Sequence, residues 1–254
     1  MYNRERLMKV APAIFAKEPA STVSDKYTFV PTYNILDLLK DYGYYIVSAE
    51  QPRMRSTKSY GLYSKHLVRL RHEDYKNFTG TDIPEILLIN SHNGKNSLGF
   101  FFGIFRLICE NGLIISSLNL MSFKSKHIHF EYETFKNVID DYMNKTDDVL
   151  GQIDRFSNIQ MSTAQRMSFA KKAKNIIWPD GSLVPEEMLI KPRREEDDKG
   201  DLYTVFNVVQ ENAMKGAISY NTPKRKVKTK EVKSIDRKLR VNLGLWELAE
   251  SYAN

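Results

Sequence analysis

Cysteine is nearly absent from this chain, whose 254 residues include only Cys109. A single thiol excludes an internal disulfide framework and any zinc site built from several cysteines. Because Cys109 lies in an apolar stretch, we interpret it as a small buried hydrophobic residue rather than a reactive thiol.

Long apolar runs are missing as well. No stretch approaches the roughly 18 consecutive apolar residues that a bilayer-spanning helix needs. The polar residues 1–6 are not followed by the apolar segment of a signal peptide. We therefore expect a soluble, cytoplasmic protein.

Signatures of catalysis are not found either. The chain has no Walker loop, no Gly-x-Ser-x-Gly and no dinucleotide fingerprint. His92, His127 and His129 could supply metal ligands, but no pair has the helical spacing of a zincin and no cysteine or carboxylate motif accompanies them. His127 and His129 lie two apart on a predicted strand and share a face, which suits a metal or a phosphate equally. The sequence thus indicates no catalytic residue, cofactor or metal site.

Basic residues, by contrast, are concentrated in two tracts. The tract 224–240 holds nine basic residues against Glu231 and Asp236, a difference that equals the whole net charge of +7. The tract 51–72 has no acidic residue and places Tyr60, Tyr63 and His66 among its cations. Both are candidates for binding a polyanion. The basic residues of the second tract are Arg53, Arg55, Lys58, Lys65, Arg69 and Arg71.

Acidic residues gather elsewhere. Residues 131–154 contain seven carboxylates against Lys136 and Lys145. Such separation of charge suits either a field that steers a nucleic acid or head-to-tail contacts between copies of the chain. The sequence does not distinguish these alternatives, and we expect a homo-oligomer.

The first half of the chain has the pattern of a sheet. Asn34 can cap a short helix at 35–42, which Gly43 ends. Strands are predicted at 44–49, 67–71, 85–89, 98–109, 113–118 and, more weakly, 128–132. Alternation within the second strand places Leu67, Arg69 and Arg71 on one side, so two guanidinium groups lie on the open face of the sheet.

The second half has the pattern of helices. An apolar stripe that begins at Phe135 continues through Ile153. Ser162 or Thr163 can cap a further helix that runs toward Ile177. Two more helices are expected at 203–215 and 239–249. Residues 192–200 form a charged loop and the best candidate linker. We predict an α+β fold with an N-terminal arm (1–26) that is mobile or docks on a sheet edge, a mostly antiparallel, βββα-like sheet core (27–131) and a helical region (132–254).

Two segments in and before the predicted strand 98–109 carry unusual residues. The run Asn90-Ser91-His92-Asn93-Gly94 suits a tight turn, and with Lys95 it could instead present donors to a phosphate. Arg106 lies inside an apolar strand, where an unpaired guanidinium is costly. It needs either a buried carboxylate from a helix or a ligand.

These segments resemble a family of phage- and plasmid-encoded proteins classed as a domain of unknown function, whose members share an "NSHDG" turn and a "G-x-FRLVCxNGL" strand. Residues 103–113 match the strand, and Asn93 stands where the turn usually has Asp. Segments 203–211 and 243–246 are similar too, so the resemblance covers roughly residues 25–250. If the Asp of the turn has a catalytic role in the family, its replacement by Asn93 removes that role in this chain.

The order of elements also resembles the core of phage single-strand annealing proteins, the Rad52 and Redβ group. This resemblance implies a sequence-independent groove for phosphates and oligomers that extend it. No base-reading motif is present in the basic tract. We therefore expect a single-stranded DNA-binding and strand-annealing protein of phage or plasmid DNA replication and recombination, located in the host cytoplasm if the chain is phage-encoded.

The expected partners are single-stranded DNA, further copies of the chain and a phage or host replication protein. A counter-defence protein that inhibits a host enzyme is the alternative, and a metal-dependent nuclease is the third. Besides the six cations of the tract 51–72, the predicted contacts to DNA are Asn90, His92, Lys95, Arg106, Lys224, Arg225, Lys226, Lys228 and Lys230.

Overall fold

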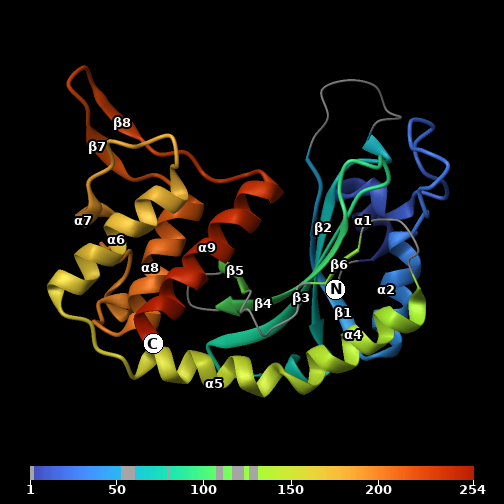
Figure 1. Ribbon diagram of the computed structural model, residues 1–254, viewed down its shortest axis with the longest axis horizontal. Helices are drawn as coiled ribbons and strands as arrows, with labels where there is room; N and C mark the ends of the chain where they lie inside the picture. Colours follow the sequence, from blue (N-terminus) through green and yellow to red (C-terminus); the bar gives the residue numbers. More distant parts are fainter. Residues whose placement is uncertain (1–2, 53–60, 79, 107–110, 116–122, 126–130) are drawn as a thin grey trace. The chain divides into compact units, whose positions relative to one another are not determined.

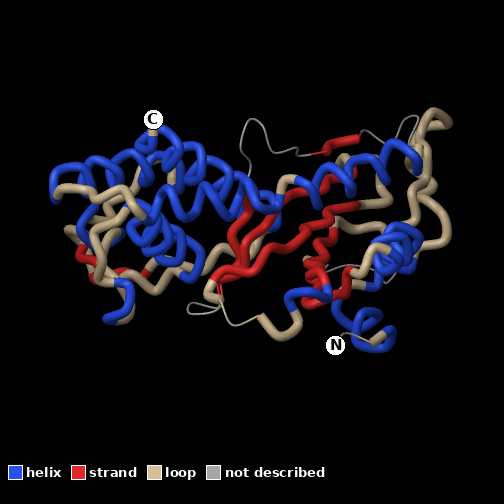
Figure 2. Tube along the Cα trace, turned by 90° about the horizontal axis from the view of Figure 1, so that it is seen from below, coloured by secondary structure: helices blue, strands red, loops and turns tan. Residues whose placement is uncertain are grey.

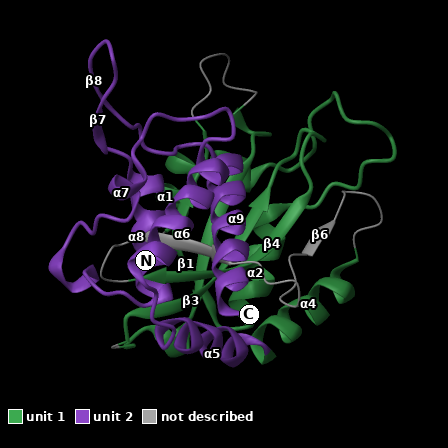
Figure 3. Ribbon diagram, turned by 60° about the vertical axis from the view of Figure 1, so that its left-hand side comes forward, with its two compact units in different colours: residues 1–144 green, residues 145–254 purple. Residues whose placement is uncertain are grey.

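The computed structural model divides the chain into two compact units, residues 1–144 and 145–254 (Figure 3). It describes residues 3–52, 61–78, 80–106, 111–115, 123–125 and 131–254. The predicted α+β class is confirmed, because an antiparallel sheet occupies the first half and helices dominate the second.

The sheet of unit 1 is antiparallel throughout the described strands (Figures 1 and 2). The strands predicted at 44–49, 67–71 and 85–89 are confirmed, and the long fourth strand is confirmed as far as Arg106. Its continuation to 109 and most of the strand predicted at 128–132 lie outside the described residues. In spatial order the strands are β1 (Tyr44–Glu50), β2 (His66–His72), β3 (Asp82–Asn90), β4 (Leu98–Arg106) and β5 (Asn111–Ile115), while β6 (Phe123–Ser125) also pairs with β4.

One face of this sheet is covered by helix α4 (Tyr132–Asn144). Phe135 and Tyr142 of α4 contact Phe100 of β4 edge to face, and Tyr142 stacks on Phe102. The Tyr142 hydroxyl also donates to the backbone carbonyl of Glu85 at 2.5 Å. Burying aromatic side chains of this size stabilises a fold by about 1.5 to 3 kcal/mol each. Arg69 and Arg71, which alternate with Val68 and Leu70 in β2, belong to the opposite face.

The N-terminal residues are docked on unit 1. They form α1 (Arg4–Val10) and a 3-10 turn, η1 (Pro12–Phe15), whose Leu7 and Ile14 are buried. Helix α1 lies against the edge strand β1. Of the two alternatives for residues 1–26, the docked segment is therefore the one observed.

Helix α2 (Thr32–Asp41) starts earlier than predicted, because it follows Pro31. Asn34 lies inside the helix, so its predicted role as a cap is wrong. Gly43, with φ at +81°, permits the turn into β1, as expected. A second 3-10 turn, η2 (Glu73–Tyr75), follows β2.

Unit 2 is mainly helical. Ser162 caps its second helix in a capping box with Gln165, as predicted. The predicted helices at 203–215 and 239–249 are present, the latter longer than expected, while the stripe from Phe135 is divided at Lys145 into α4 and α5. The helices are α5 (Thr146–Ser157), α6 (Thr163–Ile177), α7 (Glu186–Leu189), η3 (Glu195–Asp197), α8 (Leu202–Lys215) and α9 (Ile235–Ala253).

The core of unit 2 surrounds α8, of which all residues except Lys215 are buried. Trp246 of α9 is fully buried against Phe156 and Phe206. Gly244 allows α9 to approach α6, since a Cβ there would come within 2.8 Å of the Ile176 side chain. The segment 243–246 thus serves packing. None of the helices in the described ranges has the length and apolarity of a membrane span.

Candidate nucleic-acid interface

The first part of the basic tract forms a β-hairpin that the sequence did not predict. Strands β7 (Ser219–Asn221) and β8 (Lys226–Lys228) pair with Asn221 opposite Lys226 and Ser219 opposite Lys228. The turn is closed by Thr222, whose backbone and hydroxyl both bond to Arg225. Figure 1 shows this hairpin projecting from the helices of unit 2.

The hairpin has a cationic face and an apolar face. Lys226, Lys228 and Lys230 are exposed, whereas Val227 between them is half-buried and is paired with the half-buried Tyr220. Alternate residues of a strand point to the same side and are about 7 Å apart. Lys226 and Lys228 therefore lie on the same side of β8, Lys230 follows two positions after the strand ends, and we call these three exposed lysines the lysine row. Lys224 and Arg225 extend the positive charge into the turn, where both are exposed.

These five cations lack carboxylate partners within the described part of the chain. Glu231, the nearest acid in sequence, lies 3.9 Å from Lys233 instead. Like charges so close together repel one another, and a polyanion relieves that repulsion. Residues 224–230 thus have the charge and exposure that binding a phosphate backbone requires.

The second part of the tract has a different role. Arg237 and Arg240 of α9 donate to the carbonyls of Ile177 and Ile176 at 3.3 and 2.7 Å. Those carbonyls end α6, so the two arginines cap its C-terminus. The tract 224–240 is therefore an exposed hairpin followed by a helix start whose arginines hold α6 and α9 together.

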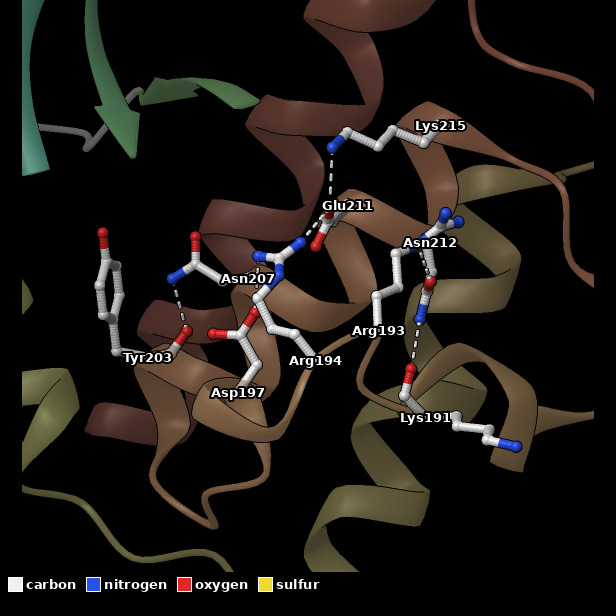
Figure 4. A network of polar contacts seen from close by, with 9 residues as sticks. All are labelled: Lys191, Arg193, Arg194, Asp197, Tyr203, Asn207, Glu211, Asn212 and Lys215. Atoms are coloured by element: carbon white, nitrogen blue, oxygen red, sulfur yellow. Dashed lines mark hydrogen bonds and ion pairs between the residues drawn. The ribbon is translucent and has the colours of Figure 1, made fainter. Parts of the chain in front are cut away.

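The base of the hairpin is held by Arg193. Its guanidinium donates to the carbonyl of Gly216 and, at 2.7 Å, to the side chain of Asn212. Asn212 in turn donates to the carbonyl of Leu189 and to that of Lys191, the second of which Figure 4 shows. Gly216 ends α8 with φ at +63°, and a Cβ there would come within 2.6 Å of the Lys230 backbone.

Arg194 anchors the same segment to α8. It binds Asp197 at 2.9 Å and Glu211 at 2.5 Å, and Lys215 binds Glu211 at 2.9 Å. Both carboxylates are buried, with side chains 1% and 3% exposed, and Figure 4 shows Arg194 between them. Residues 192–200, predicted as a linker, thus lie inside unit 2 and are attached to α8.

The sheet arginines of the second tract are engaged with an acid that the sequence analysis missed. Arg69 Nε and Arg71 NH2 each bind one carboxylate oxygen of Glu85 at 2.7 Å. Both guanidinium groups also lie over the ring of Phe105, at 4.6 and 5.4 Å from its centroid. The signal in the sequence for this pairing is Glu85 itself, a carboxylate in an otherwise apolar predicted strand. Arg53, Arg55 and Lys58 lie outside the described residues, and Lys65 is half-buried.

Asn90 and His92, predicted to contact DNA, are fully buried. Asn90 donates to the carbonyl of Val30 at 3.1 Å and to the Thr32 hydroxyl at 2.9 Å. The His92 ring lies 3.2 Å from the same hydroxyl. A fully buried side chain cannot reach a phosphate at the surface, so this prediction is wrong for both residues. They tie β3 and the following turn to α2 instead.

The hydroxyl of Thr32 is the centre of this buried cluster. His66 Nδ1 must donate to the carbonyl of Ser64, 2.9 Å away, so its Nε2 accepts the Thr32 proton at 2.8 Å. The hydroxyl oxygen then accepts from Asn90 and from His92 Nε2. Burial lowers the pKa of His66 to about 4. The His66 ring is thus neutral at physiological pH.

The remaining predicted contacts are divided between surface and interior. Lys95 is exposed, and its backbone N–H bonds to the side-chain oxygen of Asn93 at 3.1 Å, an acceptor that Asp would supply equally. Arg106 is only 7% exposed and lies directly opposite Asp82 in the sheet. Asp82 is thus its neighbour across the strands, and the two alternatives for Arg106, a buried carboxylate from a helix or a ligand, stay predictions.

No group of three His, Cys, Asp or Glu side chains that could hold a metal occurs within the ranges the structure describes. His127 and His129 lie outside those ranges.

Comparisons with known proteins identify similar chains without a described activity. A sequence profile of the family described as "Domain of unknown function (DUF932)" matches residues 19–246. The UPF0380 proteins YfjQ and YafZ of Escherichia coli (strain K12) are each 31% identical to this chain over 254 residues, which covers 98% of the chain and 90% of the relative. No solved structure matches.

Proposed function

We propose that this chain, which belongs to the DUF932 family of domains of unknown function, binds single-stranded DNA without regard to sequence and promotes strand annealing. The predicted membership of a domain-of-unknown-function family is confirmed by the match to residues 19–246. The chemistry of the proposal rests on the residues themselves, because the family description names none.

The observation that carries the proposal is the row of lysines on the hairpin. Lys226, Lys228 and Lys230 are exposed at alternate positions and have no carboxylate partner among the described residues. Lysine side chains are flexible point charges that attract phosphates but do not distinguish bases. Binding through this row is therefore independent of sequence, as annealing of any complementary pair requires.

A titration of fluorescent single-stranded and duplex oligonucleotides tests the proposal. If all five hairpin cations contact a single strand, log Kd changes with log salt by about 0.7 per contact. Raising salt from about 50 to 200 mM should then weaken binding about 100-fold, equally for unrelated sequences. The same samples should accelerate annealing of complementary strands.

Two outcomes would overturn the proposal. Binding that is insensitive to salt, or no binding at about 50 mM salt, would remove the role of the lysine row. The alternative of a counter-defence protein that inhibits a host enzyme would then be the one to pursue.

A further inference from the structure

The sheet face opposite α4 carries cations and aromatic rings side by side. Arg69 and Arg71 lie on β2, Phe105 lies on β4, and Tyr45 of β1 is directly opposite Arg71. Lys76 lies 5.5 Å from the centre of the Tyr45 ring. Both rings are half-buried, so each keeps part of its surface accessible. We call Tyr45, Arg69, Arg71 and Phe105 the sheet patch.

The charge that the sheet patch presents to solvent is positive. Glu85 is only 1% exposed, while the side chains of Arg69 and Arg71 are 19% and 15% exposed. The single carboxylate of Glu85 neutralises the charge of only one of the two guanidinium groups. It lies further from solvent than the arginines do. A ligand approaching from solvent therefore meets the cations and not the acid.

The two arginines also retain unused donors. Their bonds to Glu85 involve Nε and NH2 of Arg69 and NH2 of Arg71. The NH1 groups of both arginines are not used by these bonds, so they are the donors that a phosphate from solvent can meet. Phe105 and Glu85 hold both side chains in place, so an oxyanion can bind them with little loss of conformational freedom.

We propose that the sheet patch is a second contact for single-stranded DNA, in which Arg69 and Arg71 receive a phosphate and an unpaired base stacks on Tyr45. The inference rests on the proposed function and adds the preference for unpaired bases that the lysine row does not supply. Bases paired inside a duplex do not offer their rings to a side chain, whereas every unpaired base does.

The test compares an oligothymidylate with an abasic strand of the same length. Stacking on an aromatic side chain contributes about 1 to 3 kcal/mol per base, so Tyr45→Leu should weaken oligothymidylate binding about tenfold and leave abasic binding unchanged. Arg71→Lys keeps the positive charge but loses the paired N–H donors of the guanidinium group. It should therefore weaken binding of both strands. An oligonucleotide with a photoreactive uracil should crosslink to the Tyr45 peptide.

Tyr33→Leu is the matched control, because Tyr33 is an exposed tyrosine of α2 that also has an arginine, Arg4, 6.0 Å from its ring centre. It should bind both strands as the unmodified chain does. If Tyr45→Leu and Arg71→Lys also bind both strands as tightly as the unmodified chain, or if no crosslink forms at Tyr45, the sheet patch is excluded as a DNA contact. The hairpin proposal would still stand. If the unmodified chain binds neither strand, both proposals fail.

Discussion

At the scale of single residues, the polar side chains of the sheet are mostly committed to one another. Thr32 joins His66, Asn90 and His92, and Glu85 joins Arg69 and Arg71. Buried polar groups are tolerated where they find partners, and removing one member of a cluster leaves others unsatisfied. Substitutions in these clusters should therefore change stability more than surface substitutions do.

Thr32→Val replaces the central hydroxyl by a methyl group of nearly the same shape. His66 Nε2 and the amide of Asn90 then lose a partner, and we expect the free energy of unfolding to fall by about 2 to 3 kcal/mol. Thr32→Ser keeps the hydroxyl and should cost only about 1 kcal/mol for the lost methyl group. Denaturant unfolding of both variants measures the difference, and equal losses would show that the hydroxyl is not central.

Stability should also depend on pH through His66. Burial lowers the pKa of His66 to about 4 in the folded chain, whereas an unfolded histidine titrates near 6.5. Between pH 6.5 and 4 the unfolded state therefore binds a proton that the folded state does not. The free energy of unfolding decreases by about 3 kcal/mol as the pH falls through this window.

The ring proton signals of His66 and denaturant unfolding at several pH values test this dependence. A His66 signal that titrates near 6.5 would contradict the account.

At the scale of elements, the sequence predicted those segments whose pattern is set locally. The strands at 44–49, 67–71 and 85–89 and the helix at 203–215 have clear periodicity and were located within a few residues. The hairpin was missed because its three-residue strands are too short and polar to show alternation. Burial of Asn90 and His92 depends on Thr32 and Val30, about 60 residues earlier, which no local pattern reveals.

Glycines at helix positions provide a matched pair of element-scale substitutions. Gly216→Ala places a Cβ 2.6 Å from the Lys230 backbone at a positive φ, and should destabilise unit 2 by more than about 1 kcal/mol. Gly151→Ala adds a Cβ to the interior of α5 with no atom within 4 Å, and should stabilise by up to about 1 kcal/mol. Thermal unfolding compares them, and shifts of the same sign would contradict the assignment of Gly216 to the hairpin base.

At the scale of the whole molecule, the net charge of +7 is a poor guide to where a polyanion binds. Arg237 and Arg240 are already bonded within unit 2, Arg69 and Arg71 share the single carboxylate of Glu85, and only part of the basic surface remains uncommitted. On the hairpin, Lys224, Arg225, Lys226, Lys228 and Lys230 are exposed and have no carboxylate partner in the described chain. Binding should therefore depend on which cations are removed and not on how many.

The most direct measurement is the salt dependence of single-stranded DNA binding by a hairpin variant. Replacing Lys226, Lys228 and Lys230 by Ala removes three phosphate contacts, and the slope of log Kd against log salt should fall by about 2. The charge-matched control replaces Lys9, Lys17 and Lys40, which are exposed residues of unit 1. Its slope should equal that of the unmodified chain. Equal slopes for the hairpin variant and the control would contradict the assignment of DNA binding to the hairpin.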